Sequence, residues 1–271
     1  MTTAPTILVF DSGLGGLTVY REVARALPDA RLVYAADDAA FPYGTRAEPE
    51  LVERVLAVMT GLLAAWHPDI VVVACNTAST LVLPQLRARF GVPFVGTVPA
   101  IKPACAGSAS KLVSVLGTEA TVQREYTRVL IRDFAQGCAV TLVGSLRLAV
   151  LAEAALQGEP VADSDIAHEI GPCFVEAGGA RTDTIVLACT HYPLLLERLR
   201  RLAPWPVNFI DPAPAIARRV AELLGAAPGA AAGRAEPLPA RMVFTSGREP
   251  QPGLKAALKA YGIAEIAAAS V

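Results

Sequence analysis

The chain has 271 residues, of which 53% are hydrophobic and 18% are charged, and its formal net charge is −1. This length and composition allow a substantial buried core and exclude a disordered chain. Acidic and basic residues are interleaved without a basic stripe, so we expect no surface for binding nucleic acid.

Short apolar runs alternate with amphipathic stretches along the whole chain. In chain order, the runs that predict strands are residues 6–10, 31–35, 70–74, 93–95, 112–116, 139–143, 185–188, 207–210 and 242–244. The stretches that predict helices are residues 19–26, 48–66, 121–134, 146–157, 165–177 and 215–224. This alternation is typical of an α/β fold with mostly parallel sheets and helices on both faces.

The chain also carries a coarse internal repeat. In each half a strand leads into a polar loop, beginning at Asp11 or Gly117, and a later strand ends in a cysteine, Cys75 or Cys189. We therefore expect two pseudo-symmetric domains that face each other across a cleft. The expected domains are residues 1–98 plus 210–271 and residues 99–209. Residues 225–240 are rich in alanine, glycine and proline and predict a flexible surface loop.

Two of the five cysteines have near-twin settings. Cys75 and Cys189 each follow a four-residue apolar run that predicts a buried strand, and a polar turn follows each of them. Ligands of α/β sheets bind at the carboxyl ends of strands, so two such thiols suggest one pocket flanked by two similar acid/base groups. A racemase needs this arrangement, because it removes a proton from one face of a carbon and returns one to the other. No CxxC spacing occurs, so we expect neither a zinc site nor a thioredoxin-type centre.

A cysteine at a buried strand end is most often a small packing residue. The polar pairs after the two thiols favour a functional interpretation, because space filling would not require them. Asp11 and His191 are candidates to tune the thiols, which need a thiolate fraction near neutral pH. The cysteines without such companions are expected to be fillers of the core or surface; they are Cys105, Cys138 and Cys173.

Three loops suit the polar groups of a ligand. Residues 11–16 form a glycine-rich turn that lacks both the third glycine of a dinucleotide fingerprint and the lysine of a P-loop. Its backbone N–H groups suit a carboxylate, although a tight turn would need the same glycines. Residues 37–46, which contain Phe41 and the Pro42-Tyr43-Gly44 motif, either close over a ligand, with the Tyr43 and Gly44 backbone donating, or form a surface turn. Thr118 and Thr121 suit a second carboxylate and also suit N-capping of the next helix.

Together these motifs resemble those of the glutamate racemases, within the wider amino-acid racemase superfamily. The resemblance extends in the same order to at least Asp211 and is carried by Phe10-Asp11-Ser12-Gly13-Leu14-Gly15-Gly16-Leu17-Thr18, Pro42-Tyr43-Gly44, Ala74-Cys75-Asn76-Thr77-Ala78, Leu116-Gly117-Thr118 and Cys189-Thr190-His191-Tyr192-Pro193-Leu194. It implies two flavodoxin-like domains with the active site in the cleft between them. It also implies interconversion of L-glutamate and D-glutamate without a cofactor, which supplies D-glutamate for peptidoglycan.

By the same resemblance, Cys75 would act on D-glutamate and Cys189 on L-glutamate, each as base in one direction and acid in the other. Asp11 would assist Cys75, and His191 would assist Cys189. The residues expected to hold the substrate are Asp11, Ser12, Pro42, Tyr43, Gly44, Asn76, Thr77, Thr118, Thr121, Thr190 and His191.

One position departs from the family pattern. Members of the family often carry a glutamate in the helix near the cysteine–histidine pair. In this sequence that place is Val150, and Glu153 lies almost one turn later. Either Glu153 replaces the carboxylate or this chain does without it.

Two other functions fit the same residues. The same fold could act on aspartate or a hydantoin, which the glutamate-type flanking motifs disfavour. Alternatively, the chain could bind glutamate or a similar dicarboxylate without catalysis, which the intact cysteine pair disfavours. No lysine lies in a convincing pocket motif for a pyridoxal Schiff base, so we expect no cofactor, and no metal is expected either.

The location and assembly of the protein are also expectations. The first residues lack the positive region of a signal peptide, and the apolar runs are too short to span a membrane. We therefore expect a cytoplasmic protein with glutamate as its small-molecule partner. The resemblance implies a homodimer.

Overall fold

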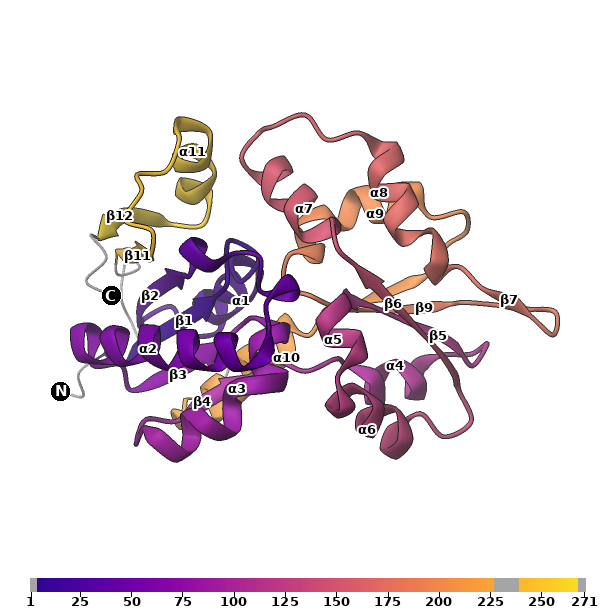
Figure 1. Cartoon of the computed structure of the whole chain (residues 1–271), viewed down its shortest axis with the longest axis horizontal. Helices are drawn as coiled ribbons and strands as arrows, with labels where there is room; N and C mark the ends of the chain where they lie inside the picture. Colours follow the sequence, from indigo (N-terminus) through magenta and orange to yellow (C-terminus); the bar gives the residue numbers. More distant parts are fainter. Residues whose placement is uncertain (1–3, 227–238, 268–271) are drawn as a thin grey trace.

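The computed structural model describes residues 4–226 and 239–267, and its strands form two main parallel sheets (Figure 1). The six-stranded sheet has the order β12-β11-β2-β1-β3-β4, and the four-stranded sheet has the order β10-β9-β5-β6. The strands of the first sheet are β1 (Thr6–Asp11), β2 (Arg31–Ala36), β3 (Ile70–Val73), β4 (Phe94–Gly96), β11 (Ala240–Phe244) and β12 (Ile263–Ala267). Those of the second are β5 (Leu112–Thr118), β6 (Ala139–Ser145), β9 (Thr184–Ala188) and β10 (Asn208–Ile210). A separate antiparallel hairpin joins β7 (Glu176–Ala177) to β8 (Ala180–Arg181).

The two main sheets repeat one strand order. The run β2-β1-β3-β4 in the first sheet corresponds to β6-β5-β9-β10 in the second, so β1 and β5 hold equivalent central places. Cys75 follows β3 and Cys189 follows β9, which are also equivalent strands. The predicted α/β fold with mostly parallel sheets is confirmed, because every pairing within the two main sheets is parallel.

The nine predicted strands all occur, with ends that differ by one or two residues. The helices are α1 (Leu17–Ala26), α2 (Glu48–Trp66), α3 (Asn76–Arg89), α4 (Ile101–Gly107), α5 (Glu119–Gln123), α6 (Glu125–Phe134), α7 (Leu148–Leu156), α8 (Asp163–Ile170), α9 (Leu196–Leu202), α10 (Ala213–Leu223) and α11 (Pro252–Ala260). The helix predicted over 121–134 is two helices, because Arg124 has an extended backbone between α5 and α6. The helix predicted over 165–177 ends at Ile170, and a short 3₁₀ turn and β7 follow it.

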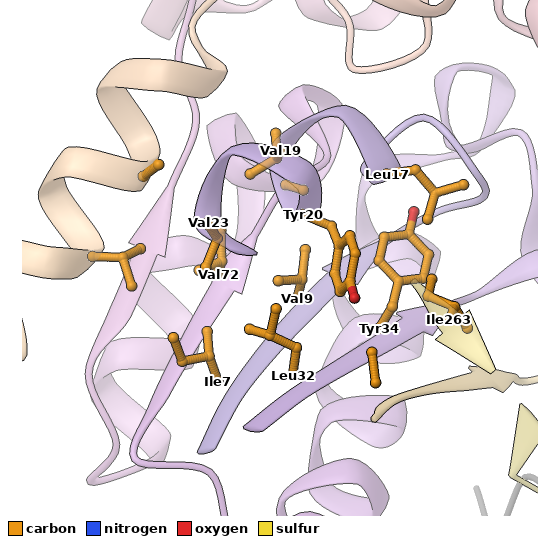
Figure 2. Packing of buried hydrophobic residues seen from close by; sticks show 14 of the residues in the cluster. Ile7, Val9, Leu17, Val19, Tyr20, Val23, Leu32, Tyr34, Val72 and Ile263 are labelled. Atoms are coloured by element: carbon orange, nitrogen blue, oxygen red, sulfur yellow. The ribbon is translucent and has the colours of Figure 1, made fainter. Parts of the chain in front are cut away.

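Both faces of the first sheet are covered, as parallel sheets require. Along β1, Ile7 and Val9 face one cluster, and Leu8 and Phe10 face the other. Figure 2 shows the first cluster, in which Ile7 and Val9 pack beneath α1 beside the side chains of β2 and β3. In the same cluster α10, which follows the last strand of the second sheet, packs against α1. The chain therefore returns to the first half after β10.

The strands of the first sheet come from residues 6–96 and 240–267, and those of the second come from residues 112–210. The domain division at residues 98 and 210 stays a prediction. Residues 227–238, most of the predicted surface loop, lie outside the described residues.

One buried hydroxyl ties β3 to β4 at their carboxyl ends, next to Cys75. Ser79 Oγ donates to the Val73 carbonyl at 2.8 Å and accepts from the Thr97 N–H at 3.1 Å. Ser79 is 3% exposed, so water cannot readily replace these bonds if the hydroxyl is lost.

We expect Ser79→Ala to lower the free energy of unfolding by about 1–3 kcal/mol, because it leaves buried backbone groups unpaired. The matched control is Thr80→Ala on the same helix, since Thr80 Oγ1 only donates back to carbonyls of its own helix. Its expected effect is within about 0.5 kcal/mol. Urea denaturation measures both, and equal stabilities for the two variants would contradict this account.

Candidate active site

Both cysteines line one small cavity between the two sheets. Cys75 and Cys189 are 5% and 6% exposed, and each lies just beyond the carboxyl end of its strand. The other lining residues are Ser12, Phe41, Pro42, Tyr43, Gly44, Asn76, Thr77, Thr118, Ala149, Thr190 and His191. This set contains the residues predicted from the sequence except Asp11 and Thr121, which lie behind the cavity wall, bonded to Thr190 and to Thr118.

The cavity has a volume of about 20 Å³, which is room for about one water molecule. An amino acid with two carboxylates has about nine or ten non-hydrogen atoms and needs several times this space. The structure is therefore a closed form. A ligand of that size enters only after the surrounding segments move apart.

Cys75 is held as a thiol. Its Sγ donates to Ser12 Oγ at 3.6 Å. Burial and the nearby charge of Asp11 raise the pKa of Cys75 to about 12, although its hydrogen bonds with the Ala78 backbone and the Ser12 side chain oppose this. At neutral pH this sulfur therefore carries its proton.

Asp11 links the two halves from behind the cavity. Its carboxylate accepts from Thr190 Oγ1 at 3.1 Å, which belongs to the other half, and from the Gly13 N–H at 3.1 Å. Burial raises the pKa of Asp11, while the charge of His191 and these hydrogen bonds oppose the change. Asp11 thus acts on Cys75 through its charge, and its hydrogen bonds fix the turn that follows Cys189.

Cys189 has a different neighbour. Its Sγ lies 3.7 Å from His191 Nδ1, and the opposite ring nitrogen, Nε2, lies 2.8 Å from Glu153 Oε1. Burial lowers the pKa of His191, but the hydrogen bonds and charges of Cys189 and Glu153 outweigh it and raise that pKa well above 6.5. An imidazole in this position is suited to take the proton of the thiol.

The carboxylate next to His191 comes from Glu153 on α7. Val150, the position expected from the family pattern, is 45% exposed. The sequence left open whether Glu153 substitutes, because a shift of three residues along a helix cannot be assigned without the orientation of that helix. In the structure it is Glu153 that reaches His191.

The glycine-rich turn after β1 does bind a carboxylate, but the carboxylate belongs to the protein. Leu14 N–H donates to Glu153 Oε1 at 2.7 Å, and Gly15 N lies 3.2 Å from His191 Nε2. A Cβ at Gly13 would collide with Glu153 Oε1, and one at Gly15 would collide with His191 Nδ1. The glycines are therefore needed because the two halves approach each other closely here, and the Leu14 N–H is committed to the protein's own carboxylate.

The contacts of His191 Nε2 also indicate which ring nitrogen carries the proton. This nitrogen cannot accept from Gly15 and donate to Glu153 at the same time. The shorter distance, to the carboxylate, favours a proton on Nε2. Nδ1 is then the atom that exchanges a proton with Cys189.

Asn76 offers a donor and an acceptor to a ligand. Its side chain is 2% exposed and lines the cavity, and neither its Nδ2 nor its Oδ1 has a hydrogen-bond partner. Buried amides are almost always paired, so both polar atoms of this side chain are available to hydrogen-bond a ligand in the cavity.

Three threonine hydroxyls bridge the two halves beside Asn76. Thr77 Oγ1 lies 3.0 Å from Thr118 Oγ1 and 3.3 Å from Thr121 Oγ1, and the last two are 2.9 Å apart. Thr118 also caps α5 by accepting from the Thr121 N–H, which confirms the predicted cap. Hydroxyls both donate and accept, so this group can turn toward a carboxylate without losing its internal bonds.

The loop of residues 41–44 supplies one wall. Pro42 and Gly44 line the cavity, and the Phe41 ring lies 5.3 Å from the His191 ring. The Tyr43 hydroxyl donates to Asp37 at 2.5 Å, so the Tyr43 phenol is committed to the protein. The sequence placed Asp37 and Phe41 in the loop expected to close over a ligand but gave neither a role of its own, and it missed Ala149.

Within residues 4–226 and 239–267, no group of three or more His, Cys, Asp or Glu side chains is arranged to hold a metal ion. Over the same ranges, no helix has the length and apolar character that crossing a bilayer requires.

The contact between Glu153 and His191 predicts how the pKa of His191 depends on the Glu153 charge. In Glu153→Gln the negative charge that raises the pKa of His191 is gone, so His191 should lose its proton at a lower pH than in the unsubstituted chain. The control is Glu197→Gln, an exposed glutamate on α9 paired with Arg200. NMR titration of the three labelled histidines measures the effect, and an unmoved His191 titration in Glu153→Gln would refute the coupling.

Comparisons with known proteins agree with this geometry. A family model described as Asp/Glu/Hydantoin racemase matches residues 7–220. The glutamate racemase of Brucella anthropi is 58% identical over 219 residues, which cover 80% of this chain and 79% of that protein. The glutamate racemase of Brucella ovis is 57% identical over 228 residues, covering 83% and 82%.

Two solved structures have the same fold. Escherichia coli glutamate racemase, in complex with L-glutamate and the activator UDP-MurNAc-Ala, superposes with a TM-score of 0.86 at 42% identity over 97% of each chain. A glutamate racemase isoform from Bacillus anthracis gives a TM-score of 0.79 at 25% identity over 100% of this chain and 99% of that one. These likenesses confirm the predicted pair of flavodoxin-like domains. The family model covers most of the chain and the relatives are more than half identical, so this chain belongs to the Asp/Glu/hydantoin racemase family.

Proposed function

We propose that this chain is a glutamate racemase that interconverts L-glutamate and D-glutamate by moving the α-proton between two cysteines, without a cofactor. The observation that carries the proposal is the pair of buried thiols, Cys75 and Cys189, which come from equivalent strands and line one closed cavity. The relatives named glutamate racemase support glutamate as the substrate.

In the direction from L-glutamate, Cys189 acts as the base. His191 Nδ1 takes the thiol proton, which leaves a thiolate beside an imidazolium, and Glu153 stabilises that positive charge from the other side of the ring. The Cys189 thiolate removes the α-proton, and Cys75, which burial keeps protonated, gives its proton to the opposite face of the carbon. One proton leaves the carbon and one arrives, so only the cysteines exchange protonation states.

In the reverse direction the roles of the two cysteines are exchanged. Cys75 begins as the thiolate and Cys189 as the thiol, and D-glutamate loses its proton to Cys75. A thiolate at Cys75 is costly beside the Asp11 charge. Asp11 would assist in two ways. It holds the turn at Thr190, and its negative charge is offset by the positive charge of the substrate ammonium group, which makes the Cys75 thiolate less costly.

The α-proton of an amino acid is very weakly acidic, so the site must stabilise carbanion character at the α-carbon. Hydrogen bonds to the α-carboxylate in a cavity shut off from water provide this stabilisation. The unpaired Asn76 amide and the threonine hydroxyls are the groups we assign to it. The full set proposed to hold the substrate is Asp11, Ser12, Pro42, Tyr43, Gly44, Asn76, Thr77, Thr118, Thr121, Thr190 and His191.

The biological setting is part of the proposal. A racemase of this kind supplies D-glutamate for peptidoglycan, and we propose that it works in the cytoplasm as a homodimer. Two domains, residues 1–98 plus 210–271 and residues 99–209, would carry the two cysteines and open to admit the substrate. The small cavity supports such an opening, because the closed form has no room for glutamate.

Proton NMR of the protein with L-glutamate in D₂O, with no cofactor added, together with chiral chromatography of the products, tests the proposed reaction. We expect the α-proton signal to disappear from the spectrum while the chromatography shows D-glutamate accumulating. Exchange with aspartate or a hydantoin but not with glutamate would keep the mechanism and change the substrate. No exchange with any of them would favour a protein that binds a dicarboxylate without catalysis.

We expect Cys75→Ala and Cys189→Ala each to abolish racemisation, because each direction needs both a base and an acid. Cys173→Ala is the matched control, since Cys173 is fully buried in the core of the second half. It should keep activity of the same order as the unsubstituted chain. A fully active Cys75→Ala or Cys189→Ala variant would rule out the two-base mechanism.

A further inference from the structure

A second buried carboxylate lies beside Asp11, outside the cavity lining. Asp37 follows β2, its N–H donates to the Asp11 carbonyl at 2.9 Å, and its side chain is 0% exposed. Burial of a charged group is costly unless hydrogen bonds compensate for the lost water. The mechanism above gives Asp37 no task.

Four donors from three segments satisfy the Asp37 carboxylate. Arg54 on α2 donates through Nη2 to Oδ1 at 2.5 Å and through Nε to Oδ2 at 3.0 Å. Thr245, just after β11, donates to Oδ1 at 2.5 Å, and the Tyr43 hydroxyl donates to Oδ2 at 2.5 Å. Burial raises the pKa of Asp37, but these hydrogen bonds outweigh it and lower that pKa, so the group is a carboxylate at neutral pH.

The loop that Tyr43 anchors reaches across to the second half at two points. On one side the Phe41 ring lies 5.3 Å from the ring of His191, the partner of Cys189. On the other side Gly44 is so close to Thr118 that a Cβ there would lie 3.1 Å from Thr118 Cβ. Between these points the loop forms the cavity wall next to Cys75.

We propose that Arg54 and Asp37 are positioning residues for the racemisation: they hold the Tyr43 hydroxyl, and through it the wall of residues 41–44, closed over both thiols. The inference rests on the proposed function. A bidentate guanidinium fixes the direction of the carboxylate, and a carboxylate with both oxygens engaged fixes the hydroxyl. The anchor is thus rigid although the loop itself has little regular structure.

A closed wall has a chemical consequence beyond stability. A thiol that has just taken the α-proton can return that same proton to the substrate only if it does not first exchange with solvent. A loosened wall admits water, so in D₂O the recovered, unconverted substrate gains deuterium. The ratio of deuterated, unconverted substrate to racemised product measures how well the wall excludes water. This ratio does not depend on how much of the protein is folded.

The experiment compares Arg54→Lys and Tyr43→Phe with the unsubstituted chain. Arg54→Lys keeps the charge and loses the bidentate geometry, and Tyr43→Phe removes only the hydroxyl. The matched control is Arg198→Lys on α9, because Arg198 donates through both Nε and Nη2 to Asp163, a similar pair away from the cavity. Steady-state kinetics and NMR in D₂O are measured for both enantiomers.

We expect both Arg54→Lys and Tyr43→Phe to raise KM for L-glutamate and D-glutamate about tenfold, as the loss of one hydrogen bond to a charged group would. The deuterium content of recovered substrate should rise in both, whereas Arg198→Lys should match the unsubstituted chain. Because the two changes act on one anchor, the double variant should show less than the product of the single effects. The inference would be overturned if Arg54→Lys and Tyr43→Phe lost thermal stability but kept the KM and the deuterium content of recovered substrate seen in the unsubstituted chain.

A second measurement decides the inference independently of turnover. The rate at which iodoacetamide alkylates Cys75, followed by mass spectrometry, should rise several-fold in Arg54→Lys and Tyr43→Phe and stay unchanged in Arg198→Lys. If the unsubstituted chain racemises no substrate, the proposed function fails, while faster alkylation still shows that the anchor closes the wall. Equal alkylation rates in all four proteins would overturn the positioning role even in an active enzyme.

Discussion

The site depends on one constraint, that the carboxyl ends of two separate sheets must meet around a cavity closed to water. A backbone hydrogen bond from the turn after β1 helps to hold the two ends together. Leu14 N–H donates to Glu153 and Gly15 N–H approaches His191, so the first half of the molecule holds the groups that surround Cys189 in the second. A backbone N–H cannot change its direction by side-chain rotation. The backbone conformation of this turn therefore fixes the positions of Glu153 and His191 before a substrate binds.

Within that cavity, two cysteines in near-twin sequence settings have different electrostatic surroundings. Burial and the charge of Asp11 raise the pKa of Cys75 to about 12. Cys189 instead lies 3.7 Å from His191, whose own pKa is raised. One sulfur is therefore a proton donor at neutral pH while the other has a base beside it. In the direction from L-glutamate, the pair therefore begins with one acid and one base.

Much of the fold was predictable, because strands buried on both faces read as apolar runs whatever their neighbours are. The elements that were missed lack such a pattern. The buried face of α3 mixes polar Asn76, Thr77 and Ser79 with apolar residues, so the extent of this helix has no clean apolar stripe to mark it. In β12, an edge strand, Ile263 is the buried residue and the central three are exposed. The break at Arg124 between α5 and α6 has neither glycine nor proline to mark it.

The sequence by itself determined the alternation of strands and helices, the cysteine pair and most of the cavity lining, because these residues follow strand ends and strand ends are local features. Only the tertiary structure decided that Glu153 rather than Val150 reaches His191, that Leu14 donates to the protein's own carboxylate, and that Asp37 anchors the loop at Tyr43. Leu14 and Glu153 are 139 positions apart. Such contacts depend on the rotation of α7 about its axis and on how closely the two halves approach, and no local pattern of residues specifies either.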